Sequence, residues 1–269
     1  MTKVKISAGI FPIDQFGKLG KIHSVFDRSF NIQVGERLLN VASYAGYLAS
    51  FGIYLPEELF QELLPYVQQG NLVKIFSNGL RIYSPTGVKK ISWSAAEVVS
   101  LQIHETLSGA QQALLKGVLL AQNLEETIGL PLEPAAQEVF AQLRQPAQQS
   151  PAAWRQLLTY LIGRGKGLTP SGDDLLAAYL VMLSLIDHKS AAALTAALAG
   201  LNFSTTDISR EYLYHAQRGA VNSLMYQLYL DLLADREEKI EQDVRQLMQI
   251  GHSSGKDLCY GLLLALQAQ

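Results

Sequence analysis

LIGRGKGLTPSGDDLLAAYLVMLSLID, residues 161–187, joins a glycine-rich turn to one long apolar segment. Three glycines alternate there with Arg164 and Lys166, and glycine frees the backbone for a tight or left-handed path. Thr169 is a good N-cap and Pro170 suits a first helical turn, so a helix is predicted to begin at these residues. The stretch therefore predicts a helix N-terminus presented by a flexible loop.

The helix behind this loop is apolar on nearly every face, which predicts that it runs through the middle of its domain. Ser171, Asp173 and Asp174 fall in its opening turn. Unpaired N–H groups and the helix dipole at such an end can hold a phosphate or stabilise the helix's own carboxylates. Two adjacent aspartates at the start of a buried helix need partners, because isolated buried charge is costly. Simple capping by the two aspartates is the alternative interpretation.

The chain as a whole reads as an α+β protein of two parts. Residues 1–94 contain short strand-like runs, a two-residue hairpin signal at Asn78-Gly79 and one helical pattern near 55–70, which predicts a mostly antiparallel β sheet or small barrel with one helix. Residues 95–269 have helical spacing and predict an all-α domain that carries the glycine loops. Its later helices are expected near 134–144, 154–162, 189–200, 206–234, 236–249 and 256–268.

Composition limits the classes of function. The chain has 269 residues, of which 48% are hydrophobic, and a formal net charge of −2. This length can bury a real core, and the charge gives no reason to expect nucleic acid or a membrane surface as a partner. No apolar run reaches the roughly 20 residues of a spanning helix, so a cytoplasmic protein is expected. The one cysteine, Cys259, excludes an intrachain disulfide and is expected in the core.

The glycine loop has an internal echo. The run Ser-Gly-Asp-Asp-Leu at 171–175 is matched by Ser-Gly-Lys-Asp-Leu at 254–258, and an Arg-Gln-Leu helix precedes each. The two loops are therefore predicted to lie side by side as equivalent helix N-termini. In that arrangement Asp174 corresponds to Asp257, and His252 stands where the first loop has Thr169.

These residues suggest a site for a small polar molecule. Two helix N-termini with Arg164, Lys166 and Lys256 nearby would bind an anion. His252 could polarise a carbonyl or move a proton, with a capping or surface histidine as the alternative. The three carboxylates of Asp173, Asp174 and Asp257 could accept bonds from a substrate amide or hold magnesium. No cofactor is fixed by the sequence; magnesium at Asp173 and Asp174 is the candidate.

A third segment, from Ser209, is read as part of the 206–234 helix. Gly219 would then stand in mid-helix, where it costs about 1 kcal/mol against alanine, so close packing is expected there. His215 is interpreted as a satisfied helix histidine. The Gly-Arg-Gly-Lys-Gly run follows a helix rather than a strand and lacks the Gly-Lys-Ser/Thr ending, which excludes a dinucleotide fingerprint and a P-loop.

Three segments resemble a known family: GRGKGLTPSGDDLLAAYL, ISREYLYHAQRGAVNSL and IGHSSGKDLCYGLLLAL, in that order. They are similar to the signature segments of the AllH-type subunit of oxamate carbamoyltransferase. In the N-terminal half the resemblance lies in KIHSVFDRSFNI and LLNVA. The resemblance implies a three-subunit assembly in allantoin and purine breakdown, which interconverts oxalurate plus phosphate with oxamate plus carbamoyl phosphate.

Carbamoyl transfer needs a phosphate cradle, a donor to the carbamoyl oxygen and a clamp for a small carboxylate. On this expectation His252, Asp173, Asp174 and Asp257 are the catalytic candidates, with His252 at the carbonyl. The anion- and substrate-binding candidates are Gly165, Lys166, Gly167, Thr169, Ser171, Ser253, Ser254 and Gly255. The partners would be the other subunits and a small carboxylate or phosphate-bearing metabolite. The alternatives are a non-catalytic metabolite-binding or scaffolding subunit and a metal-dependent hydrolase of ureido compounds.

Overall fold

Buried and more exposed residues alternate along 72–76 and 80–83, so one face of the sheet is covered there and the other is open, as antiparallel pairing allows. The protein, as a computed structural model, is described over residues 3–93, 95–202 and 204–268. The chain divides into two compact units, 1–101 with 220–223 and 102–219 with 224–269. The predicted α+β class is confirmed. The division into domains at 1–94 and 95–269 stays a prediction.

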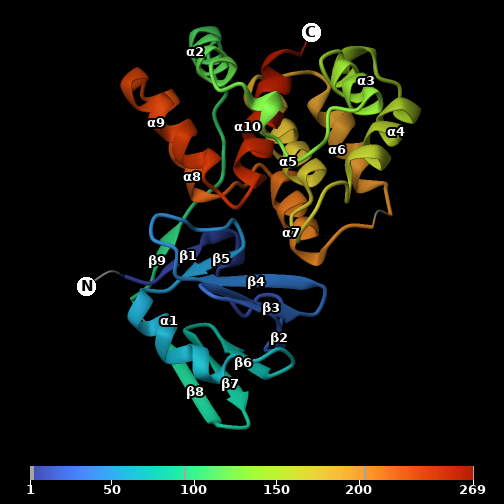
Figure 1. The fold of residues 1–269 in the computed structure, drawn as a ribbon. Coiled ribbons are helices and arrows are strands. Elements are labelled where there is room, and N and C mark those ends of the chain that lie inside the picture. Colours follow the sequence, from blue (N-terminus) through green and yellow to red (C-terminus); the bar gives the residue numbers. More distant parts are fainter. Residues whose placement is uncertain (1–2, 94, 203, 269) are drawn as a thin grey trace. The chain divides into compact units, whose positions relative to one another are not determined.

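The described part of the first unit contains a curled nine-stranded sheet in the order β8-β7-β6-β2-β3-β4-β5-β1-β9. Most neighbours are antiparallel, and the pairs β4–β5 and β1–β9 are parallel. The strands are β1 (Lys5–Ser7), β2 (Leu19–Phe26), β3 (Ser29–Val34), β4 (Arg37–Ala42), β5 (Gly52–Tyr54), β6 (Leu72–Phe76), β7 (Gly79–Ser84), β8 (Gly87–Ser92) and β9 (Glu97–Val99). Figure 1 shows them in blue to green.

The predicted hairpin is present, with a shifted turn. Phe76 pairs with Gly79, so the two-residue loop is 77–78 and Gly79 opens β7. A side chain at Gly79 would overlap the backbone of Ile91 on the next strand, which is why glycine stands there. The helical interpretation of the residues after 94 is wrong at its start, because Glu97–Val99 form β9 against β1.

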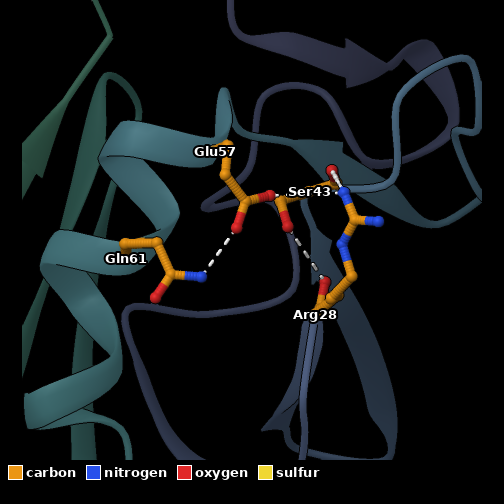
Figure 2. A network of polar contacts seen from close by, with 4 residues as sticks. All are labelled: Arg28, Ser43, Glu57 and Gln61. Carbon is orange, nitrogen blue, oxygen red and sulfur yellow. Dashed lines mark hydrogen bonds and ion pairs between the residues drawn. The ribbon is translucent and has the colours of Figure 1, made fainter.

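The predicted helix of this unit, α1 (Glu57–Leu63), begins beside the β3–β4 strands and buries Phe60 and Leu63. Glu57 accepts hydrogen bonds from Gln61 Nε2 at 2.6 Å and from Arg28 at 3.3 Å. Figure 2 shows these side chains around Ser43, whose backbone N–H bonds the Arg28 carbonyl at 3.0 Å. The pKa of Glu57 is lowered first by the hydrogen bond from Gln61, then by one from the Ser43 side chain, and then by the charge of Arg28. The network ties the start of α1 to the sheet.

The second unit is helical in its described residues. Its helices are α2 (Gly109–Leu120), α3 (Pro134–Leu143), α4 (Pro151–Leu161), α5 (Ser171–Leu185), α6 (Ala191–Ala199), α7 (Asp207–Ala216), α8 (Ser223–Leu233), α9 (Glu237–Met248) and α10 (Ser254–Leu266). As predicted, α5 is central: all its residues are buried except Ser184. It packs along α10, which is buried in the same way (Figure 1).

The single helix predicted over 206–234 is wrong. The chain forms α7 and α8 instead, with a break at Gly219, whose φ of +70° lies in the left-handed region that favours glycine. The residues between the helices turn away, and Val221 N–H bonds the Leu101 carbonyl at 3.1 Å within the first unit. Gly219 therefore lies in the turn after α7, which ends at Ala216, and not in the middle of a helix.

No helix in the described parts of the chain combines the length and apolarity needed to cross a membrane.

Candidate functional site

The glycine loop before α5 follows a path that only glycine adopts easily. Gly165 has a φ of +126°, and a methyl group on it would press against the Ser171 backbone nitrogen. The helix begins at Ser171 with Pro170 as its N-cap, one residue later than predicted. Thr169 is therefore not the N-cap, and its hydroxyl is available for a contact across to the second loop.

The turn from α4 into α5 is held by two backbone hydrogen bonds. Arg164 N–H bonds the Leu161 carbonyl at 3.0 Å, and Gly172 N–H bonds the Arg164 carbonyl at 2.8 Å. A methyl group on Gly172 would overlap the Leu161 carbonyl oxygen. Glycine is thus needed for the close approach of α5 to the end of α4.

The turn from α9 into α10 repeats this arrangement. Ile250 N–H bonds the Leu247 carbonyl at 3.1 Å, and Gly255 N–H bonds the Ile250 carbonyl at 3.0 Å. A methyl group on Gly255 would overlap the Leu247 carbonyl oxygen. The two turns therefore share one backbone design, in which Gly172 corresponds to Gly255 and Asp174 to Asp257. The first loop is longer by three residues, counted from Leu161 and Leu247.

The two turns lie side by side, as the sequence repeat predicted. The Thr169 and Ser254 hydroxyl oxygens are 2.9 Å apart. About two turns of helix further in, Gly261 lies against the Leu175 carbonyl and the Ala178 methyl group so closely that any side chain would overlap the Leu175 oxygen. Gly261 and Ala178 are themselves equivalent, each six residues after its turn glycine, so the two helices cross at matching points.

Asp173 links two other segments of the chain to the start of α5. Its Oδ1 accepts the Gly163 N–H at 2.9 Å, and its Oδ2 accepts the Thr205 hydroxyl. Burial raises the pKa of Asp173, and the bonds from Thr205 and Gly163 oppose that rise. With both oxygens engaged, this carboxylate fixes the glycine loop and the segment before α7 to the start of α5.

Asp174 and Asp257 differ from Asp173 because each has a buried oxygen without a partner. Asp174 is 7% exposed and Asp257 is fully buried, and the Oδ2 atom of each forms no hydrogen bond in the described structure. Asp257 Oδ1 accepts the Gly129 N–H at 2.8 Å. Gly129 lies so close to the Ser171 and Ser253 hydroxyls that a side chain there would overlap both.

The electrostatics separate these two carboxyl groups. Burial raises the pKa of Asp174 well above its usual range; the Ser254 hydroxyl opposes this, and Asp257 adds to it. Burial also raises the pKa of Asp257, but the Gly129 N–H, the Ser171 and Ser253 hydroxyls and Lys256 all act against the shift. The arrangement therefore favours a protonated Asp174 beside a more readily ionised Asp257.

The predicted cationic and histidine candidates lie on the outer side of the turns. Lys166 and Gly167 are exposed, and so is His252 in the second loop. Lys256 Nζ approaches the His252 carbonyl at 3.5 Å. Arg164 turns back along α4, where its guanidinium lies 3.9 Å from the centre of the Tyr160 ring. The catalytic role of His252 and the anion-binding role of Lys166 stay predictions.

Residues 161–266 match the family described as oxamate carbamoyltransferase subunit AllH, and residues 5–98 match the AllH family N-terminal domain. The chain belongs to the AllH family. The AllH match begins at the end of α4 and contains both turns and α7, while the N-terminal match spans the sheet from β1 into β9. A family named as a subunit implies partner subunits. No solved structure matches the chain.

The magnesium prediction gains no support from the geometry. In the residues that the structure describes, no three His, Cys, Asp or Glu side chains are grouped so that they could hold a metal ion. Asp173, one of the two candidate ligands, already has both oxygens bonded within the protein.

Sequence reasoning missed two residues that complete the arrangement, Gly129 and Thr205. Thr206 caps α7 by accepting the Ser209 N–H at 3.0 Å, and its hydroxyl bonds the Leu168 carbonyl at 2.5 Å. The Thr-Thr-Asp run before α7 is a capping signal that could have predicted a third helix N-terminus beside the glycine loop. Gly129 had no such signal, because it reaches the turns only through the tertiary fold.

Proposed function

We propose that this chain is a subunit of a carbamoyltransferase complex that interconverts oxalurate plus phosphate with oxamate plus carbamoyl phosphate, and that the paired turns bind the carbamoyl end of the substrate. The supporting observation is the pair of buried, unpartnered oxygens on Asp174 and Asp257. Buried polar atoms normally have partners, so two such atoms at adjacent helix ends point to a missing donor. The proposal includes a role in allantoin breakdown and a cytoplasmic location.

The chemistry of the substrates fits acceptors of this kind. Oxalurate, oxamate and carbamoyl phosphate each end in a carbonyl that carries an NH₂ group. Asp257, held by Gly129 and the more readily ionised of the pair, would accept a hydrogen bond from that NH₂ group. An amide NH₂ group donates hydrogen bonds, whereas a carboxylate only accepts them. The Asp257 carboxylate would therefore bind the carbamoyl end of the substrate and not its carboxylate end.

Charge sets the orientation of the substrate. The buried carboxylate of Asp257 would repel a phosphate or carboxylate, so the anionic end has to face the exposed glycine loop with Lys166 and Lys256. The Gly165, Gly167 and Ser171 backbone remains the proposed cradle for that end. His252, exposed in the second loop, remains the candidate donor to the carbamoyl oxygen. Because the two Oδ2 atoms are covered, entry requires the loop at 163–169 to open.

The reaction gives Asp174 a distinct role. In the direction of oxalurate cleavage, a phosphate oxygen bonds the carbamoyl carbon, the bond from that carbon to the oxamate nitrogen breaks, and this nitrogen takes up a proton. Asp174, kept protonated by burial and by its acidic neighbours, would give that proton. Phosphate replaces the nitrogen on the carbamoyl carbon, and no oxidant or covalent enzyme intermediate is needed.

The test is turnover by the complex reconstituted with Asp174→Asn or Asp257→Asn. Each is expected to lower kcat/KM by about 100-fold or more, as loss of an acid–base group does. Asp243→Asn is the matched control: this acid also has a buried, unpartnered Oδ2, but it lies in α9 away from the turns. Full turnover by the Asp174 and Asp257 variants in an assembled complex would overturn the proposal. Calorimetry with oxamate then separates the alternative, since tight binding with unchanged turnover identifies a non-catalytic metabolite-binding subunit.

A further inference from the structure

One face of the sheet carries a row of like charges that the fold does not explain. Directly opposed residues of antiparallel strands point to the same side. Lys74 of β6 is opposite Arg81 of β7, which is opposite Lys90 of β8. Like charges in direct opposition destabilise a sheet by some tenths of a kcal/mol per pair, so this row costs the isolated chain stability.

Beside this row runs a second one, which is largely apolar and open to solvent. Leu72 of β6 is opposite Tyr83 of β7, which is opposite Val88 of β8. Leu72 is 64% exposed and Val88 57% exposed. On β2, Lys21 extends this row and Leu19, 72% exposed, extends the cationic one. The outer face is defined as these eight residues: Leu19, Lys21, Leu72, Lys74, Arg81, Tyr83, Val88 and Lys90.

The opposite side of the same strands is the core. Val73, Ile75, Leu80, Ile82 and Ile91 alternate with the outer face and are buried. The exposed leucines and valine are therefore not displaced core residues, because the strands already fill the core with their other side. Asp and Glu occupy none of the eight outer positions, although the chain has 24 acidic residues and a net charge of −2.

Two further features suit a protein surface rather than bare solvent. A shallow hollow of about 310 Å³ opens beside Leu19, Lys21 and Leu72. Arg81 and Lys74 lie over the Phe76 ring, with 5.1 and 5.6 Å to its centre, which limits the freedom of both cations. Preordered cations beside exposed aliphatic side chains form a ready contact for an apolar ridge flanked by carboxylates.

We propose that the outer face docks a partner subunit of the complex through a surface of aliphatic residues flanked by Asp and Glu. Charge complementarity selects this occupant: acidic side chains would relieve the repulsion in the Lys74–Arg81–Lys90 row, and apolar ones would cover Leu72 and Val88. A lysine-bearing edge strand also discourages sheet-to-sheet aggregation, but that function needs no exposed leucines. The inference rests on the subunit role and is independent of the carbamoyl chemistry of the helical turns.

The experiment measures association of the full chain with the other carbamoyltransferase subunits, by sedimentation or surface-based binding at 50 and 300 mM NaCl. Lys74→Glu combined with Lys90→Glu is expected to weaken association by at least tenfold at low salt and to flatten its salt dependence. The same double variant should leave the isolated chain as stable as wild type or slightly more stable, because opposite charges replace like ones. Unfolding therefore cannot account for lost binding.

The matched control is Lys116→Glu combined with Lys189→Glu, which makes the same change in net charge within the helical unit, on α2 and in the turn between α5 and α6. It should bind as wild type does. Unchanged association of the outer-face variant would overturn the proposal, and so would an equal loss in both double variants. Three other results would assign the face to another occupant. They are a wild-type self-dimer that the outer-face variant disrupts, or wild-type binding to a single-stranded oligonucleotide or to anionic vesicles that the variant loses. Because turnover is not the readout, the result is separate from that of Asp174 and Asp257.

Discussion

The two helix turns of the second unit share a backbone but use their acidic positions differently. The turn into α5 carries Asp173 and Asp174, whereas the turn into α10 carries Lys256 and Asp257 at the equivalent places. Asp173 is bonded through both oxygens, while Lys256 reaches toward the second loop. The shared position, Asp174 and Asp257, holds the unpartnered oxygens. The first acid of the α5 turn therefore holds a longer loop in place, whereas the second acid of each turn keeps one buried oxygen without a partner in the described structure.

The largest effect should come from the turn glycines. Gly172→Ala or Gly255→Ala puts a methyl group against a helix carbonyl, so each should lower the free energy of unfolding by about 3 kcal/mol and Tm by about 6–12 °C. Gly117→Ala is the control: nothing lies near it in mid-α2, and it should gain up to about 1 kcal/mol. If alanine at only one of the two glycines leaves the free energy of unfolding unchanged, the two turns are not equivalent.

Removing the links made by Asp173 should have the next largest effect. Asp173→Ala deletes the bonds from Gly163 and Thr205, and is expected to cost about 2 kcal/mol in chemical denaturation. Exposure of the 163–169 backbone to hydrogen exchange should rise in the same variant. If Asp173→Ala instead leaves stability and exchange intact while turnover stops, Asp173 belongs with the ligand-binding acids.

Asp174→Asn should stabilise the protein at pH 8 by about 1.5 kcal/mol, because burial opposes the ionisation of this carboxyl group in the folded state while the unfolded state ionises freely. The sign follows from the raised pKa: the folded state holds the proton more tightly than the unfolded state, so this group favours folding at low pH. That contribution is lost as pH rises through the folded-state pKa. Asp257→Asn should show the same sign and a smaller gain, since its pKa is opposed by more partners. Unfolding measured from pH 4 to 8 checks both, and equal gains would contradict the assigned difference.

The smallest effect concerns the link between the turns. Thr169→Val removes the hydroxyl contact with Ser254 and should cost about 1 kcal/mol. Thr195→Val serves as the comparison, because the Thr195 hydroxyl bonds only the Ala191 carbonyl within α6 and its loss should be nearly neutral. Equal costs would show that the Thr169–Ser254 contact adds nothing to the pairing of the turns.

Local chemistry explains what the sequence could predict. The all-apolar run after Asp174 predicted a central helix, and the Ser-Gly-x-Asp-Leu repeat predicted two neighbouring helix ends because the same order of helix, glycine turn and helix recurs. The structure adds the reason for the repeated glycine, which is the close approach of each helix to a preceding carbonyl. Short strand-like runs and the Asn78-Gly79 hairpin signal predicted the sheet. The predicted proximity of Asp174 and Asp257 follows from the same repeat.

Tertiary contacts explain what it could not. Residues 97–99 become β9 only because β1, far away in the chain, offers a free edge. The chain leaves its helical path after Ala216 because, beyond Gly219, Val221 bonds Leu101 instead of continuing a helix. The division of labour between Asp173 and Asp174 depends on Gly129 and Thr205, which local patterns do not connect to the loop.

The crossing at Gly261 limits how this unit can move. With no side chain between that residue and the Leu175 carbonyl, α5 and α10 interlock too tightly to slide or rotate past each other. A molecule could then reach the two aspartates only if the connecting backbone moves as a hinge while the two helices keep their relative position.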